Sequence, residues 1–309
     1  MATPPRWAIP GTFLITKRTL MRMFLLKPGS VVNAVLLYVL GLAANKYGIR
    51  IHAFIFLSDH GHMMATDPVG GQMSGFMQYL FSLAGRSLNR HYRRRENFWS
   101  SEKPNCVWIA PRAEDLADKL AYVLCNAVIS GLVDRMQKWP GVKVTTDDLG
   151  RLTINAKRPN FFFSKKLPEE VTYTTCLPEC EDATERQLIA MVRERCREIE
   201  EEKRNEMAIE RRPFLGAKRA REVDAFDCAR TPEPLGELEP HIACKDTPTR
   251  IKLIDRLRLF RSQYREALAA YCAGKRKTHF PWGTLKLVQY LGCCCHGPDP
   301  RPSLGAIAI

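Results

Sequence analysis

Two histidines one residue apart, His60 and His62, have the type and spacing of a possible metal-binding pair. They follow the apolar run "RIHAFIFLS" at 50–58, which is typical of a buried strand. On a continuing strand, residues i and i+2 point to the same face, so two imidazoles would lie within reach of one divalent ion. Two ligands seldom hold a metal, so the pair fits either a metal site or a polar sheet face.

A second pair, Tyr122 and Asn126, is four residues apart in a helix that the sequence predicts over 113–135. The apolar stripe of this helix consists of Leu116, Leu120, Val123, Leu124 and Ala127. Tyr122 and Asn126 fall nearly opposite that stripe. Such a tyrosine can pack on the surface by chance, or it can be a nucleophile beside an oxygen ligand.

The elements that must position these residues follow from hydrophobic periodicity. Strands are predicted at 11–19, 50–58, 60–66 and 106–110, and helices at 29–45, 71–92 and 113–135. The order strand, helix, strand, strand, helix, strand, helix predicts an α+β fold of the ferredoxin-like split βαβ type. We expect an antiparallel sheet with its helices on one face.

The second half of the chain has a different character. A highly charged helix is predicted over 179–212, proline-rich loops around 230–240, and an amphipathic helix over 249–274. We therefore divide the chain into a first domain at 1–145 and a mainly helical C-terminal extension at 146–309. The sequence assigns no role to this extension, and our default expectation is accessory DNA binding or partner docking.

Composition favours a polyanionic partner. The 309 residues include 47 Lys and Arg against 33 Asp and Glu, with a sequence pI near 9.4, and residues 1–58 contain no acidic side chain. This balance predicts nucleic acid first and an anionic membrane second. Eleven irregularly spaced cysteines, with no secretion signal, indicate a reducing cytoplasm. The apolar stretch at 30–48 falls short of the roughly 20 apolar residues of a membrane span.

Basic residues gather in two places. Lys17, Arg18 and Arg22 lie beside the first predicted strand. The second group consists of Arg86, Arg90, Arg93, Arg94 and Arg95, interleaved with His91, Tyr92, Phe98 and Trp99. Arginines for phosphates and aromatic rings for bases are how single-stranded or hairpin DNA is held. The second group also fits a solvated helix end, and Tyr92 is a rival nucleophile beside it.

"HGH", followed on a later helix by "YVLCNAVISGLV", resembles the single-tyrosine HUH transposases, especially the REP-associated tyrosine transposases. In that family two histidines flank a hydrophobic residue, and a later helix carries Y-x-x-x-N-P-V-x-x-G-L-V. "ITKRTLMRMFLL" at 15–26 is similar to the family's first strand and the entry to its first helix, and "HAFIFLSDHGHMMATD" is similar to its central hairpin. The resemblance covers roughly residues 8–140.

The resemblance implies that Tyr122 is the nucleophile and that His60, His62 and Asn126 bind a divalent ion, Mg²⁺ or Mn²⁺ in use. It implies cleavage and rejoining of single-stranded or hairpin DNA through a 5′-phosphotyrosine, by a cytoplasmic, nucleoid-associated protein that is a monomer or homodimer, without a membrane. A non-catalytic nucleic-acid-binding module on the same fold stays open as an alternative. A replication initiator or relaxase would usually need a further histidine or a second tyrosine, and neither is evident.

The sequence departs from the family pattern at three positions. Gly61 stands between the histidines where a bulky apolar residue is usual, so an anchor on the opposite face is missing and the site could be looser. Asp59 replaces the usual asparagine and adds a negative charge that could attract a metal or repel DNA. Ala127 replaces the proline after Asn126. None of the three removes a ligand or the nucleophile.

Overall fold

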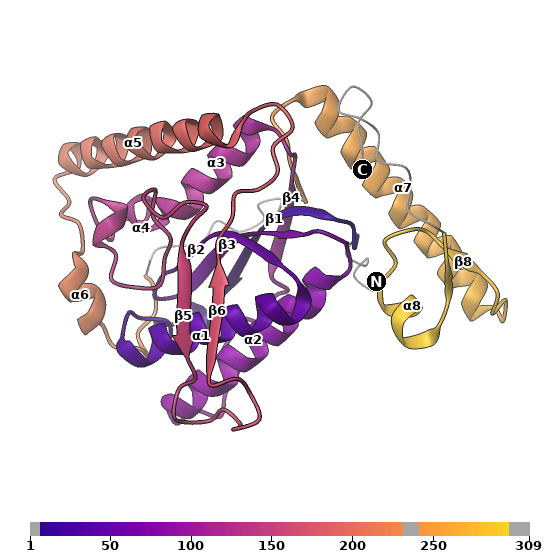
Figure 1. Cartoon of the computed structure of the whole chain (residues 1–309), viewed down its shortest axis with the longest axis horizontal. Helices are drawn as coiled ribbons and strands as arrows, with labels where there is room; N and C mark the ends of the chain where they lie inside the picture. Colours follow the sequence, from indigo (N-terminus) through magenta and orange to yellow (C-terminus); the bar gives the residue numbers. More distant parts are fainter. Residues whose placement is uncertain (1–6, 231–240, 297–309) are drawn as a thin grey trace.

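A computed structural model describes residues 7–230 and 241–296, and its centre is a mostly antiparallel five-stranded sheet (Figure 1). The strand order is β2-β3-β1-β4-β7. These strands are β1 (Gly11–Arg18), β2 (Arg50–Phe56), β3 (His60–Asp67), β4 (Asn105–Ile109) and β7 (Ile242–Ala243). Only the short β7 runs parallel to its neighbour β4. The predicted strands of the first half are thus all present, and a segment from the second half of the chain extends the sheet.

The two central strands fix the places of both histidines. β1 pairs antiparallel with β3, and Thr16 lies opposite His62 while Arg18 lies opposite His60. Directly opposed residues share a face of the sheet, so these four side chains are on one face. β2, rich in Ile and Phe, is buried from Ile51 to Phe56 and closes a hairpin with β3, with the Leu57 N–H donating to the His60 carbonyl at 2.8 Å.

Helices lie on both sides of the sheet, which corrects the expectation of one face. Figure 1 shows α1 (Ser30–Tyr47) and α2 (Gln72–His91) on one side of the strands and α3 (Ala113–Leu124) on the other. α3 packs on β2 and β3, on the face that carries the histidines. The face needs this cover because Leu14 and Met64, on the same side of β1 and β3, are buried apolar side chains.

α1 is the most apolar of the long helices in the described residues. By length and composition it could cross a membrane, whereas the sequence had predicted a stretch too short to do so. Within this fold more than half of it is buried, against α2 and against the hairpin of β5 (Thr153–Lys157) and β6 (Glu170–Thr174). α1 therefore has the burial of a core helix that is covered on several sides.

The helix predicted over 113–135 is wrong in its second half. α3 ends at Leu124, a single turn α4 (Asn126–Ile129) follows, and a short 3-10 helix η2 (Met136–Lys138) comes later. Gly131 explains the end of α4, because its φ of 68° is a left-handed conformation that glycine adopts without strain. Tyr122 and Asn126 consequently lie on two helices joined at Cys125.

The second half of the chain is less helical than predicted and packs closely on the first. Besides β5, β6 and β7, its described residues form α5 (Glu185–Ile209), α6 (Ala217–Glu222), α7 (Thr247–Cys272), β8 (His279–Phe280), α8 (Lys286–Leu291) and β9 (Cys294–Cys295). α5 starts at a capping box formed by Thr184 and Gln187, and it packs along α3. One buried apolar cluster contains side chains from both sides of residue 145, among them Val171, Leu188 and Leu253. Most of the proline-rich segment predicted at 230–240 lies outside the described residues.

Candidate active site

His60 and His62 lie side by side on β3, with ring centroids 4.8 Å apart. Each ring is held through its Nδ1 atom. His60 Nδ1 is 2.7 Å from Asp59 Oδ1, and His62 Nδ1 is 2.8 Å from the Thr16 hydroxyl. If both Nδ1 atoms carry the proton, both Nε2 atoms present lone pairs, which is the tautomer that binds a metal.

Burial favours the neutral form of His62. Burial is the largest cause that holds the pKa of His62 well below its usual value, with smaller contributions from the neighbouring His60 and Arg18, so this ring is neutral at pH 7. Burial raises the pKa of Asp59, but the hydrogen bond from His60 and the charges of His60 and Arg22 outweigh it and leave the pKa lowered. The Asp59 carboxylate is therefore an acceptor, and His60 Nδ1 donates to it.

Tyr122 reaches the same place from α3. Its hydroxyl lies 3.5 Å from His62 Nε2, and the two rings meet edge to face with centroids 5.1 Å apart. Burial raises the pKa of the Tyr122 phenol, and the opposing effects of the Asn126 amide and of the Arg18 charge do not cancel the rise. The phenol is thus protonated at neutral pH and needs a further positive charge beside it to become a nucleophile.

Asn126 supplies the observation that best tests whether a metal ion fits. Its Oδ1 atom is buried and accepts no hydrogen bond, an arrangement that costs stability unless the oxygen has a partner. Two oriented imidazoles and an unpaired amide oxygen are a donor set suited to a divalent ion with open positions. Within residues 7–230 and 241–296 no cluster of three or more His, Cys, Asp or Glu side chains could hold a metal, so this set depends on the amide.

The structure explains Gly61 between the histidines. A Cβ atom at Gly61 would lie 2.6 Å from Phe56 Cδ1, because the Phe56 ring of the neighbouring strand covers the glycine. Phe56 is buried and thus fills the space on the face opposite the histidines that a bulky residue at 61 would occupy. The looser site expected from the sequence is not what this packing indicates. Ala127, the third departure, is fully buried.

The basic residues beside β1 have different placements. Lys17 is on the face opposite the histidines and is buried, and its ammonium group donates to the carbonyls of Ser100 and Glu102. This placement does not fit the phosphate contact that the sequence suggested. Arg18 is exposed opposite His60, and Arg22 lies 3.6 Å from the Asp59 carboxylate. Arg18 and Arg22 thus lie at the histidine end of the sheet.

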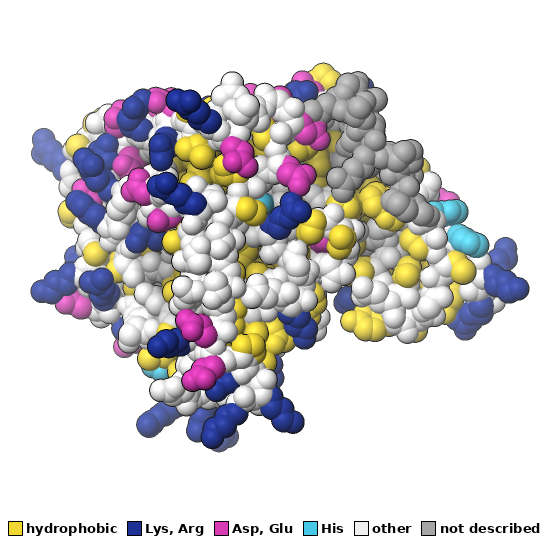
Figure 2. Space-filling model, viewed as in Figure 1, with side chains coloured by type: hydrophobic (Ala, Val, Ile, Leu, Met, Phe, Trp, Pro, Cys, Tyr) yellow, Lys and Arg dark blue, Asp and Glu magenta, His cyan; other side chains and the backbone are white. Residues whose placement is uncertain are grey.

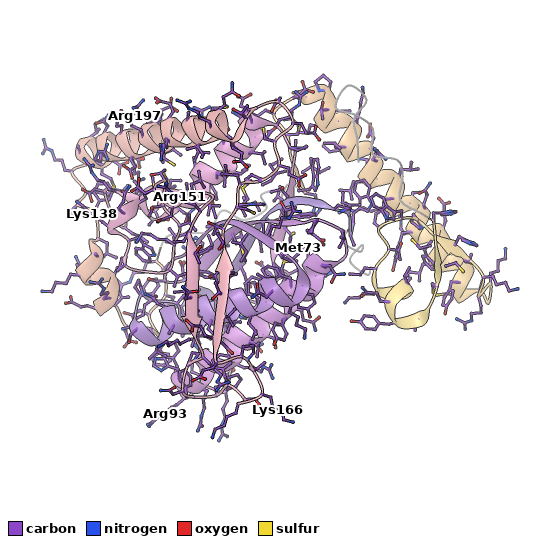
Figure 3. All side chains as sticks on the ribbon, in the orientation of Figure 1. Met73, Arg93, Lys138, Arg151, Lys166 and Arg197 are labelled. Carbon is purple, nitrogen blue, oxygen red and sulfur yellow. The ribbon has the colours of Figure 1, made fainter. Side chains whose placement is uncertain are left out.

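The second basic group lies at the end of α2. Arg86 and Arg90 are exposed on its last turns and Arg93 and Arg95 follow it, whereas Arg94 turns inward to Met23 Sδ at 3.6 Å. Figure 2 shows Lys and Arg side chains gathered at the lower end of the view, where Figure 3 labels Arg93. Phe98 and Trp99 do not take part, since Phe98 is buried and the Trp99 indole donates to the Phe81 carbonyl.

Sequence reasoning missed the residues that orient the histidines. Thr16 is an ordinary strand residue in sequence, and only the register of β1 on β3 brings its hydroxyl to His62. Asp59 was noticed for its charge, but its contact with His60 depends on the hairpin turn. Adjacency to a candidate ligand was the one signal that could have indicated Asp59 as an orienting carboxylate.

Comparison with known proteins gives remote likenesses. No family model matches the chain, and no curated protein matches it. A solved structure of a REP-associated tyrosine transposase bound to a REP hairpin is 20% identical, with a TM-score of 0.39, over 48% of this chain and 85% of that one. A protein of Deinococcus radiodurans assigned as a transposase is 15% identical, with a TM-score of 0.28, over 36% of this chain and 87% of that one.

Proposed function

We propose that this protein is a transposase-like enzyme that cuts and rejoins single-stranded or hairpin DNA, with Tyr122 as the nucleophile. The observation that carries the proposal is the convergence of Tyr122 and the two imidazoles, with a hydroxyl-to-Nε2 distance of 3.5 Å. We further assign the strand order β2-β3-β1-β4, with helices α1 and α2 as the two crossovers, to the ferredoxin-like split βαβ fold of HUH endonucleases.

The reaction conserves the number of phosphoester bonds. The Tyr122 oxygen forms a bond to phosphorus, the bond from phosphorus to the 3′-oxygen breaks, the phenol loses its proton and the departing oxygen gains one. The resulting 5′-phosphotyrosine keeps the ester energy, so a second 3′-hydroxyl can attack it, restore the tyrosine and join two strands without a nucleotide cofactor.

The side chains around Tyr122 have separate tasks in this proposal. His60, His62 and Asn126 would hold Mg²⁺ or Mn²⁺, with Asp59 and Thr16 fixing the two imidazoles. When bound, the ion withdraws negative charge from the phosphate and stabilises the departing oxygen. Arg18 adds a fixed positive charge near the phenol. This charge lowers the pKa of Tyr122 and so favours the ionised form that attacks the phosphate.

The excess of basic residues supports DNA as the substrate, because an exposed arginine cluster without interspersed acidic residues attracts a phosphate backbone. We propose that the protein acts in the cytoplasm on nucleoid DNA, as a monomer or homodimer.

A covalent-adduct assay tests the proposal. We expect wild-type protein with Mn²⁺ to form a denaturation-resistant adduct with a hairpin oligonucleotide carrying a single-stranded flank, and Tyr122→Phe to form none while its affinity for the oligonucleotide stays within twofold. Tyr92→Phe is the matched control: burial raises the pKa of Tyr92 to about 12, and its ring is half-buried beside the arginines. Adducts that persist in Tyr122→Phe and vanish in Tyr92→Phe would show that the wrong tyrosine has been assigned.

A further inference from the structure

Two exposed phenylalanines from the second half of the chain meet the arginine group at the end of α2. Phe226 is 54% exposed and Phe162 is 43% exposed, although large apolar side chains are usually covered. Phe162 belongs to the loop between β5 and β6, and Phe226 to the segment after α6. The two rings therefore come from segments far apart in sequence and join one surface.

Phe226 contacts the arginine group through Arg94 and Tyr92. Its ring centroid is 6.0 Å from the Arg94 guanidinium and 6.0 Å from the Tyr92 ring. The backbone around it is fixed, because the carbonyl of Asp227 accepts from the Phe24 N–H at 2.8 Å and the Ala229 N–H donates to the Arg22 carbonyl at 3.3 Å. Arg22 also contacts Asp59, so the segment that carries Phe226 is linked through Arg22 to the turn before the histidine pair.

Phe162 is held in a conformation that costs free energy. Its φ is 69°, in the left-handed region that bulky residues rarely adopt. The Arg86 guanidinium lies 5.9 Å from its ring, and the neighbouring Phe161 ring is 6.2 Å from His91. Phe163 packs in the opposite direction, against buried Tyr38 with centroids 5.2 Å apart. The strained residue is thus the one of the three whose ring is exposed.

Exposed arginines without ion pairs lie beside the two rings, and the nearby acidic side chains are Glu96 and, next to Phe226, Asp224 and Asp227. Within the described residues, none of Arg90, Arg93 and Arg95 forms an ion pair, and all three are exposed. Lys165 and Lys166 are exposed in the loop that carries Phe162, and Figure 3 shows Lys166 and Arg93 at the same end of the molecule. Glu96 is the exposed acidic side chain that directly follows the arginines.

We propose that Phe226 and Phe162 are stacking platforms for the bases of single-stranded DNA, whose phosphates the arginines at the end of α2 hold. Exposed rings beside unpaired cations match the two needs of such a strand, an apolar face for each base and a positive charge for each phosphate. This inference rests on the proposed DNA substrate and specifies where the strand lies outside the cleavage site.

The test compares oligonucleotides with and without bases. We expect Phe226→Ala and Phe162→Ala each to weaken binding of a fluorescent single-stranded oligonucleotide by roughly 5- to 150-fold, the range for loss of one stacked base. Neither change should weaken binding of the same backbone made of abasic sites. Phe226→Trp should keep the affinity, whereas Phe226→Leu, apolar but not aromatic, should lose it. Tyr290→Ala is the matched control, because Tyr290 is an aromatic residue 75% exposed on α8.

The outcomes separate this inference from the proposed function. Phenylalanine variants that bind within twofold of wild type, or that lose equal affinity for the abasic strand, would refute stacking while leaving the Tyr122 chemistry intact. A matched RNA strand that binds more tightly than DNA, with the same dependence on Phe226, would overturn DNA as the ligand. Wild-type protein that binds no single-stranded DNA would refute the stacking inference, and wild-type protein that binds neither single-stranded nor hairpin DNA would refute the proposed function itself.

Discussion

Replacement of Gly61 by alanine tests the packing that supports the histidine pair. Gly in a strand interior is usually destabilising, so Gly→Ala at an open strand position should gain about 0.5–1 kcal/mol. At Gly61 the new Cβ atom would lie 2.6 Å from Cδ1 and 2.8 Å from Cε1 of Phe56, closer than real carbon atoms pack. Overpacking of this kind costs about 1–3 kcal/mol.

The Phe56 ring has little freedom to move away. Its side chain is buried, its N–H donates to the Val142 carbonyl at 2.9 Å, and its carbonyl accepts from the Trp139 indole at 2.9 Å. We therefore take an overpacking cost of about 2 kcal/mol, subtract the gain of about 1 kcal/mol, and expect Gly61→Ala to lower the free energy of unfolding by about 1 kcal/mol.

The Phe56→Ala background should reverse the sign. Removing the ring costs about 3–5 kcal/mol through lost burial and a cavity, but it also removes the clash, so adding Gly61→Ala should then raise stability by about 1 kcal/mol. Urea unfolding of the wild type, both single variants and the double variant measures this coupling. A Gly61→Ala variant that is more stable than wild type, or single effects that add fully in the double variant, would refute the packing argument.

Three further predictions concern single side chains. Thr16→Val should weaken Mn²⁺ binding in calorimetry by about 10- to 100-fold through the loss of the hydroxyl that orients His62, and equal weakening in Thr12→Val would contradict this. Burial lowers the pKa of His52 to about 4, so the native state binds fewer protons than the unfolded chain between pH 4 and 6.5. The free energy of unfolding should therefore fall by about 3 kcal/mol as the pH drops across that window. Urea titrations of His52→Gln should show a free energy of unfolding that depends less on pH. Asp67→Asn should cost about 3 kcal/mol in the same unfolding assay, because its buried carboxylate accepts the N–H groups of Gly70, Gln72 and Met73 at 2.8 Å each; a loss below 1 kcal/mol would argue against this cap.

Alternation and helical periodicity were enough to predict the placement of the histidines on a strand and of Tyr122 on a helix. Both patterns are local, since they follow from the geometry of one element. The end of the helix before Asn126 was missed because the apolar periodicity continues past the break, whereas the backbone at Cys125 ends α3 and Gly131 follows the end of α4. The contacts of Thr16 and Phe56 were missed because each depends on the register between strands.

The arginine group shows the same distinction between local and tertiary signals. The sequence alone indicates its charge. The aromatic partners predicted for it do not lie on the surface beside the arginines, because Phe98 is buried and the Trp99 indole donates to the Phe81 carbonyl. Phe162 and Phe226 take their place only because the β5–β6 loop and the segment after α6 fold back onto α2. The boundary predicted at residue 145 places these rings and the arginines in different domains. In the structure, however, the arginine surface and the buried apolar cluster both contain residues from the two halves of the chain. A truncated chain ending at residue 145 would therefore keep the histidines and Tyr122 while losing both exposed rings and the β7 edge of the sheet.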